Sequence, residues 1–167
     1  MNATVKEQIL RHVVTRLEAI NAGTSPADYA STVSRVVRGI VDPDESTGKT
    51  VLMLATASET PDGPSGERKA GGGPGRGTQY RLMTLTVDAW VAAEFITDAD
   101  TVALGADIER AVLTDRYMDG HAVNSWWRST TITPVSTQAA PVGLLRVEFQ
   151  IQFRTVYGQP ETPLPAA

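Results

Sequence analysis

A strict alternation of apolar with charged or amide side chains runs through Leu145–Arg154, LRVEFQIQFR. Successive side chains of a β-strand point to opposite faces of the sheet, so this pattern predicts a strand with one buried and one polar face. Burial of each apolar side chain contributes about 1.5–3 kcal/mol, which makes the face worth on the order of 10 kcal/mol in gross terms. A slip of one residue would exchange the two faces, and the pattern therefore fixes the register of the strand.

Two further strands and a helix are predicted upstream of this segment. A strand at 126–135 can pair with it across a loop at 136–143, and Tyr80–Ala92 is a longer strand whose apolar face begins at Met83. Between them, apolar residues at helical spacing follow the acidic start Thr97–Asp100, which predicts an amphipathic helix over 99–113. Gly105 inside that helix costs about 1 kcal/mol relative to alanine.

The N-terminal third supplies the other expected elements. A narrow apolar stripe from Val5 to Ile20 predicts a helix over 4–20, and the β-branched segment Val33–Val41 predicts a strand. Val51–Leu54 is apolar without alternation, which favours a strand buried on both faces.

The segment Ser58–Gln79 has a different character. It holds seven glycines and three prolines in 22 residues, so we expect a flexible loop that lengthens the tip of a hairpin. A lengthened loop is tolerated because the cost of closing it grows only logarithmically with its length. The Pro-rich end, 158–167, is expected to be an extended and frayed tail.

These elements predict one α+β domain over 1–157, in the order α-β-β-β-α-β-β. Two helices with a single apolar stripe each are both satisfied by packing on one face of a mostly antiparallel sheet. A chain of 167 residues is long enough to bury one such core. The opposite face keeps the polar residues of the alternating segment.

Composition excludes several classes of function. The chain has no cysteine, so disulfides and thiolate chemistry are absent, and its net charge of −4 argues against binding nucleic acid as a main role. We expect no export signal at the N-terminus and no membrane anchor, because no apolar run is long enough.

The candidate chemical motifs are weak. Pro43–Thr50 ends like a phosphate-binding loop, but a predicted strand follows Lys49 where the motif requires a helix. The glycines of 71–78 lack a fixed spacing, and His12 and His121 have no clustered carboxylates around them. We therefore expect no catalytic, cofactor-binding or metal-binding residue and no enzymatic activity.

Interaction with other protein chains is the expected role instead. The adjacent residues Trp126 and Trp127 must point to opposite faces of a strand, so one ring is expected in the core and the other under a loop or a second subunit. Basic side chains of the glycine-rich loop and of the polar strand face are further candidates. The candidate interface residues are Arg68, Lys69, Arg76, Trp126, Trp127, Arg146 and Arg154.

Several segments, in order, resemble the tail-terminator and tail-completion proteins of long-tailed bacteriophages. They are the N-terminal stripe leading into RVVRG at 35–39, the strand YRLMTLTV at 80–87, the helix ADIERAVL at 106–113 and the final strand RVEFQIQFRTVY at 146–157. The resemblance covers roughly residues 4–157, and the insertion 58–79 departs from shorter members.

The resemblance implies a structural virion protein, found in the tail or neck and assembled in the host cytoplasm. Six subunits would form a ring that caps the tail tube, ends its polymerisation and contacts the connector or stopper of the head. DNA would pass through the ring without sequence-specific binding. The loop 58–79 and the Trp126–Trp127 strand would serve neighbouring subunits or the tube.

Other functions stay open on the sequence alone. A head-side stopper or neck protein of the same particle is the nearest alternative. A small-molecule-binding or enzymatic α+β domain would require a cleft with convergent polar groups. A nucleotide-binding regulator would depend on Lys49.

Overall fold

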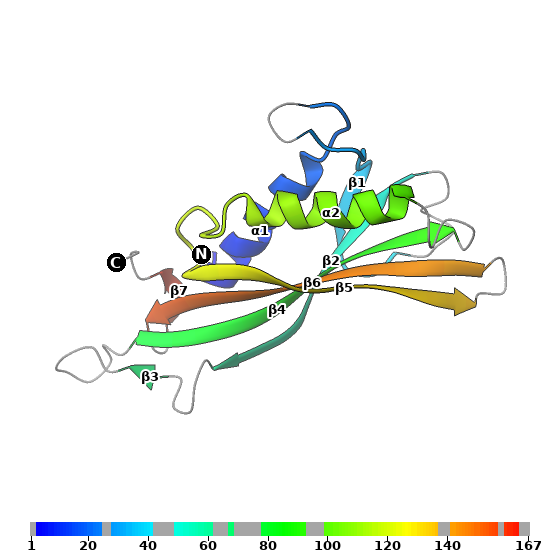
Figure 1. Ribbon diagram of the computed structural model, residues 1–167. Coiled ribbons are helices and arrows are strands. Elements are labelled where there is room, and N and C mark those ends of the chain that lie inside the picture. The colour runs from blue at the N-terminus through cyan, green and yellow to red at the C-terminus, as the bar shows by residue number, and fades with distance from the viewer. Residues whose placement is uncertain are drawn as a thin grey trace.

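The computed structural model describes residues 3–24, 28–41, 49–61, 67–68, 78–92, 99–136, 141–156 and 159–163 (Figure 1). Two helices and seven strands lie within these ranges. In chain order they are α1 (Val5–Glu18), β1 (Arg35–Arg38), β2 (Val51–Pro61), β3 (Glu67–Arg68), β4 (Thr78–Ala92), α2 (Ala99–Leu113), β5 (Asn124–Ser136), β6 (Pro141–Val156) and β7 (Gln159–Pro163).

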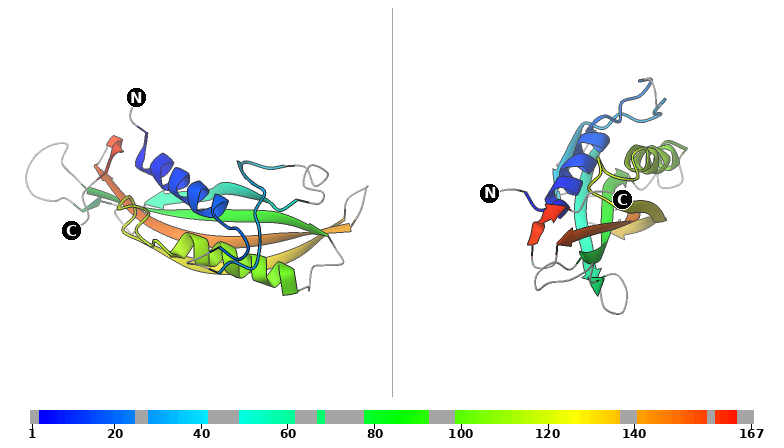
Figure 2. Two further views of the ribbon diagram at one scale, coloured as in Figure 1. Left: turned by 90° about the horizontal axis from the view of Figure 1, so that it is seen from above. Right: turned by 90° about the vertical axis from the view of Figure 1, so that its left-hand side faces the viewer.

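The strands form one sheet with the order β1-β2-β4-β6-β5. Only β1 and β2 run parallel, and all other pairs are antiparallel, with the short β3 beside β4 and β7 beside β6. Both helices cover the same face of this curved sheet (Figures 1 and 2). The predicted α+β class, the element order and the mostly antiparallel sheet are therefore confirmed.

The core lies between the helices and the two central strands. In the β4–β6 ladder, Met83 stands opposite Ile151 and Leu85 opposite Phe149, and all four side chains are fully buried. The stripes of α1 and α2 pack onto them, as the alternation of β6 predicts. The helical contributors with no exposed surface are Val5, Ile9, Val13, Leu17, Ile108 and Val112.

The helix boundaries follow from local signals. Thr4 is the N-cap of α1, and its hydroxyl accepts a hydrogen bond from the Glu7 amide at 3.1 Å. Helix α2 has the predicted bounds. Gly105 faces the sheet at short range, because a Cβ at that position would lie 3.4 Å from the Thr130 methyl group.

Several strand boundaries differ from the predictions. Strand β1 covers only Arg35–Arg38, and β2 continues from the apolar Val51–Leu54 through polar residues to Pro61. Strand β4 begins at Thr78, so both ends of the expected loop 58–79 are paired strand. The predicted hairpin is present, but most of the loop between its strands lies outside the described residues.

The predicted frayed tail also contains ordered backbone. Residues Gln159–Pro163 form β7, which pairs with the end of β6 at Thr155 and Val156. Backbone hydrogen bonding to an existing strand offsets a sequence with little apolar content, which side-chain patterning does not reveal.

A second, smaller apolar cluster lies on the face opposite the helices. Val41, Val51 and Met53 are buried there against the partly buried Trp90 and Leu144. Leu52 and Leu54 enter the main core from the same strand. The prediction that Val51–Leu54 is buried on both faces is therefore confirmed.

Candidate interaction surface

Neither helix packs on the second face of the sheet (Figure 2). Every second residue of the central strands points to this face. Its side chains are therefore those that alternate with the buried apolar residues in β4 and β6. The ladder sets opposite one another Asp88 and Arg146, Thr86 and Glu148, Thr84 and Gln150, Leu82 and Gln152, and Tyr80 and Arg154.

An ion pair lies within this polar face. The Arg146 guanidinium donates two parallel hydrogen bonds to the Asp88 carboxylate, from Nε to Oδ1 at 2.8 Å and from Nη2 to Oδ2 at 2.7 Å. The hydrogen bond to Asp88 raises the pKa of Arg146 above its ordinary value. The side chain of Asp88 is 13% exposed and that of Arg146 is 41% exposed, so the carboxylate is more strongly shielded from water than the guanidinium. The candidate Arg146 is thus held in a fixed, bidentate geometry.

Threonines fill the middle of the same face. Thr84 and Thr86 are 7% and 3% exposed although they point away from the helices. The Thr86 hydroxyl lies 3.4 Å from the Ala55 carbonyl of the neighbouring strand. Short β-branched side chains between longer neighbours make this part of the face a closely packed polar surface rather than a binding cleft.

The tryptophan pair lies on β5, at the edge of the sheet. Trp126 stands opposite Gln150 on the polar face, and Trp127 stands opposite Phe149 on the helix face, as predicted for adjacent strand residues. The expectation that one ring enters the core is wrong: Trp126 is partly buried and Trp127 is 44% exposed. An edge strand with a β-bulge between Trp127 and Ser129 leaves both rings at the margin of the core.

The remaining candidate cations are dispersed. Arg154 lies on the polar face opposite Tyr80, and the backbone of Arg68 pairs with Thr78 in the short β3–β4 ladder. Lys69 and Arg76 lie outside the described residues. The structure therefore brings Arg146, Arg154 and Trp126 onto one face and places Trp127 on the other side of β5.

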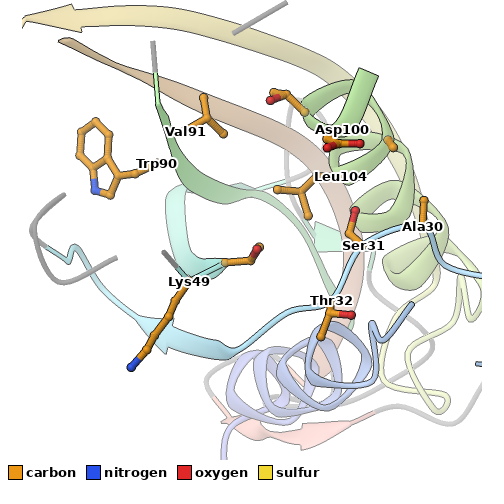
Figure 3. Close-up of a pocket in the computed structure, with 11 residues that line it drawn as sticks. Ala30, Ser31, Thr32, Lys49, Trp90, Val91, Asp100 and Leu104 are labelled. Atoms are coloured by element: carbon orange, nitrogen blue, oxygen red, sulfur yellow. The ribbon is translucent and has the colours of Figure 1, made fainter. Parts of the chain in front are cut away.

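A cleft of about 360 Å³ lies between the segment 30–32, the first turn of α2 and the end of β4 (Figure 3). Its polar residues do not converge: the Lys49 side chain extends away from Asp100 and Ser31, and the Trp90 indole donates to the Val41 carbonyl at 2.8 Å.

Asp107 is a buried carboxylate, although the spread of acidic residues around this helix in the sequence predicts a solvated position. It is 2% exposed and accepts the backbone N–H groups of Ala30 and Ser31 at 2.9 and 2.8 Å. These bonds attach the segment before β1 to α2. In the sequence, only the apolar residues at neighbouring positions of the helix indicate that Asp107 is buried. The amides that it binds cannot be recognised, because they are distant in the chain.

The structure also shows where the other polar motifs lie, namely the end of the phosphate-loop-like segment and the two histidines. Strand β2 begins directly after Lys49 and Thr50, so these residues do not precede a helix N-terminus. His12 is partly buried on α1, with Nε2 3.3 Å from the Asp115 carboxylate, and His121 lies in a turn. Within the described ranges, no group of three or more potential metal ligands is present, and neither helix has the length and apolarity to span a membrane.

The chain matches no protein-family model and no curated protein sequence.

Proposed function

We propose that this protein is a structural subunit of a bacteriophage particle, which assembles into a ring that caps the tail tube and joins the tail to the head connector. The supporting observation is the two-faced sheet: both helices cover one face, and the other face carries an ordered polar surface around the Asp88–Arg146 pair. Such a surface suits contact with another protein, because the Asp88–Arg146 pair at its centre is already held in position.

The sequence resemblance supplies the specific assignment to the tail terminators. Its segments fall on α1 and β1, on β4, on α2 and on β6, which are the elements that form the helix–sheet core. The resemblance therefore concerns the architecture, and the particle, the ring and the partners belong to the proposal. DNA would cross the ring without sequence-specific contacts, in keeping with the net charge of −4.

Assembly of the purified chain tests the proposal. We expect light scattering to give the mass of about six copies, and negative-stain electron microscopy to show rings with a central channel, because head-to-tail interfaces close into rings. Added to polymerising tail-tube protein, the chain should shorten the tubes and occupy one end of each. A chain that stays monomeric alone and does not bind tube ends would overturn the proposal.

The position of the bound protein separates the two phage roles. Gold labelling of the chain should place it at the head-proximal end of the tail. Label on tail-less heads instead would assign it to the head-side stopper or neck.

A further inference from the structure

The outer edge of β5 has no neighbouring strand in the part of the chain that the structure describes. Among the described residues, β5 pairs with β6 alone and is the last strand on its side of the sheet (Figure 1). It runs for 13 residues with Arg128 as its single charged residue. Natural edge strands are protected from pairing with another chain by shortness, charge, proline or a β-bulge. Strand β5 has one charge, and the stretch 129–133 between its bulge and Pro134 is left available for strand addition.

Pro134 reveals which backbone groups point outward. It stands opposite Gly143 of β6 and has no N–H to donate, so its nitrogen must lie on the side away from the ladder. Backbone groups of alternate residues in an antiparallel strand point to the same side. Ile132 and Thr130 therefore also direct their N–H and C=O groups to the open edge.

We infer that this edge pairs with the same edge of a second copy of the chain, antiparallel, around a twofold axis at Thr131. That axis places Thr130 of each copy opposite Ile132 of the other, and each of these pairs exchanges both of its hydrogen bonds. An axis at Ile132 would set Pro134, which has no N–H to donate, against Thr130 in the regular part of the strand, whereas the axis at Thr131 places Pro134 opposite Arg128 at the β-bulge.

The charged residues of the two edge strands favour pairing of β5 with the β5 edge of a second copy rather than with its β1 edge. In the twofold arrangement, Arg128 faces Pro134 of the second copy, and no like charges meet. Strand β1 offers only four residues, two of which are Arg35 and Arg38, so its edge would bring further positive charge to Arg128.

Exposed apolar side chains border the same edge. Trp127 is 44% exposed on the helix side of β5, and the twofold arrangement brings it close to Pro134 of the second copy. Val102, which is 62% exposed, lies one turn of α2 before Gly105, the residue that approaches Thr130. Burial of these side chains adds to the hydrogen bonds. The contact is isologous and therefore distinct from the head-to-tail interfaces of the proposed ring, so it would join two free copies or copies of two rings.

Single cysteines test the inference directly, because the chain has none of its own. Thr131→Cys would face its own copy across the axis in a non-hydrogen-bonded pair, about 4.5 Å apart between Cα atoms, which a disulfide can bridge. Thr133→Cys is the matched control: it is exposed on the same strand and face, but would lie roughly 13 Å along the strand from its copy.

After mild oxidation, non-reducing electrophoresis should give at least about ten times more covalent dimer from Thr131→Cys than from Thr133→Cys. Equal yields, or no dimer from Thr131→Cys, would overturn the inference. The ring is judged separately by mass: six-fold rings without this cross-link refute only the twofold contact, whereas cross-linked dimers with no larger species refute only the ring.

Discussion

At the scale of single residues, the Asp88–Arg146 pair is the most specific feature of the polar face. A guanidinium and a carboxylate that stand directly opposite on neighbouring strands form both hydrogen bonds without distortion of either strand. Removal of the arginine would leave a largely buried carboxylate without its cation. That loss is more costly than the loss of an exposed ion pair.

We predict that Arg146→Ala lowers the free energy of unfolding by about 1–2 kcal/mol, a figure already reduced for the 41% exposure of the arginine. Urea denaturation at neutral pH measures the change. The control Arg128→Ala removes a pair with an Nε–Oε2 distance of 3.9 Å and should change stability by no more than about 0.5 kcal/mol. Equal effects from the two variants would contradict the assigned role of Asp88.

Alternation predicts which face a residue joins better than it predicts how deeply the residue is buried. Met83 and Phe149 were assigned to the core by alternation and are fully buried. Trp126 and Trp127 were assigned to opposite faces correctly, but the depth of both rings was not predictable. Their exposure depends on the place of β5 at the sheet edge and on a bulge, and both are set by pairing between distant segments.

At the scale of elements, an ion cluster joins α1 to β1. Glu7 accepts hydrogen bonds from Arg38 of β1 at 2.8 Å and from Arg11 of its own helix at 2.9 Å. These bonds, the one from Arg38 first, lower the pKa of Glu7 from 4.5 to about 2. A carboxylate with a lowered pKa stabilises the fold above its ordinary pKa, and this contribution is lost as the pH falls towards the folded-state value.

Wild-type stability should therefore decrease between pH 4.5 and about 2 by an amount that Glu7→Gln does not show. We expect no more than about 1 kcal/mol, since both arginines are substantially exposed. Denaturation midpoints of the two proteins, measured across this range, give the difference. Parallel curves would show that the cluster does not link α1 to the sheet.

Gly105 offers a second test between elements, here α2 and the sheet. A methyl group at this position would be in van der Waals contact with Thr130 at 3.4 Å and with Leu145 at 3.8 Å. Gly105→Ala should therefore gain up to about 1 kcal/mol of stability from helix propensity. Gly105→Leu should lose stability, because the longer side chain has no space between helix and sheet. The melting temperatures of both variants, measured by thermal unfolding, test these expectations. An increase in stability on Gly105→Leu would refute the close packing of α2 on the sheet.

Segments with a strong hydrophobic periodicity were correctly predicted as helices or strands. Where the periodicity is weak, the ends of the strands could not be predicted. Helix α2 and the β6 alternation were readable because their apolar residues face one core. The polar part of β2, Ser58–Pro61, carries no such pattern and is strand because β4 lies beside it. The same explanation holds for β7, whose pairing with β6 depends on the fold of the whole sheet.

At the scale of the whole molecule, we predict that the segment 62–77 serves assembly rather than folding. The β2–β4 ladder extends to the pair Pro61 and Arg81 without it, and the described part of this segment adds only the two-residue strand β3 beside β4. Replacement of 62–77 by a short Gly-Ser turn should leave the melting temperature within a few degrees, because closing a shorter loop costs no more than closing a longer one. Ring formation or attachment to tail tubes should decline in the same variant. Unchanged assembly, measured by light scattering and microscopy, would remove the segment from the interface.

Strand β6 has a consequence for the order in which the chain folds. It lies in the middle of the sheet, where Thr78 pairs with Val156 and Ala92 pairs with Val142, yet α2 and β5 separate these partners in the chain. During synthesis, the backbone edge of β4 that pairs with β6 must therefore wait unpaired until residues 141–156 have left the ribosome. Pairing across so long a separation is slow, and the waiting strand is prone to aggregate. Slower translation between β4 and β6 should accordingly lower the yield of folded protein.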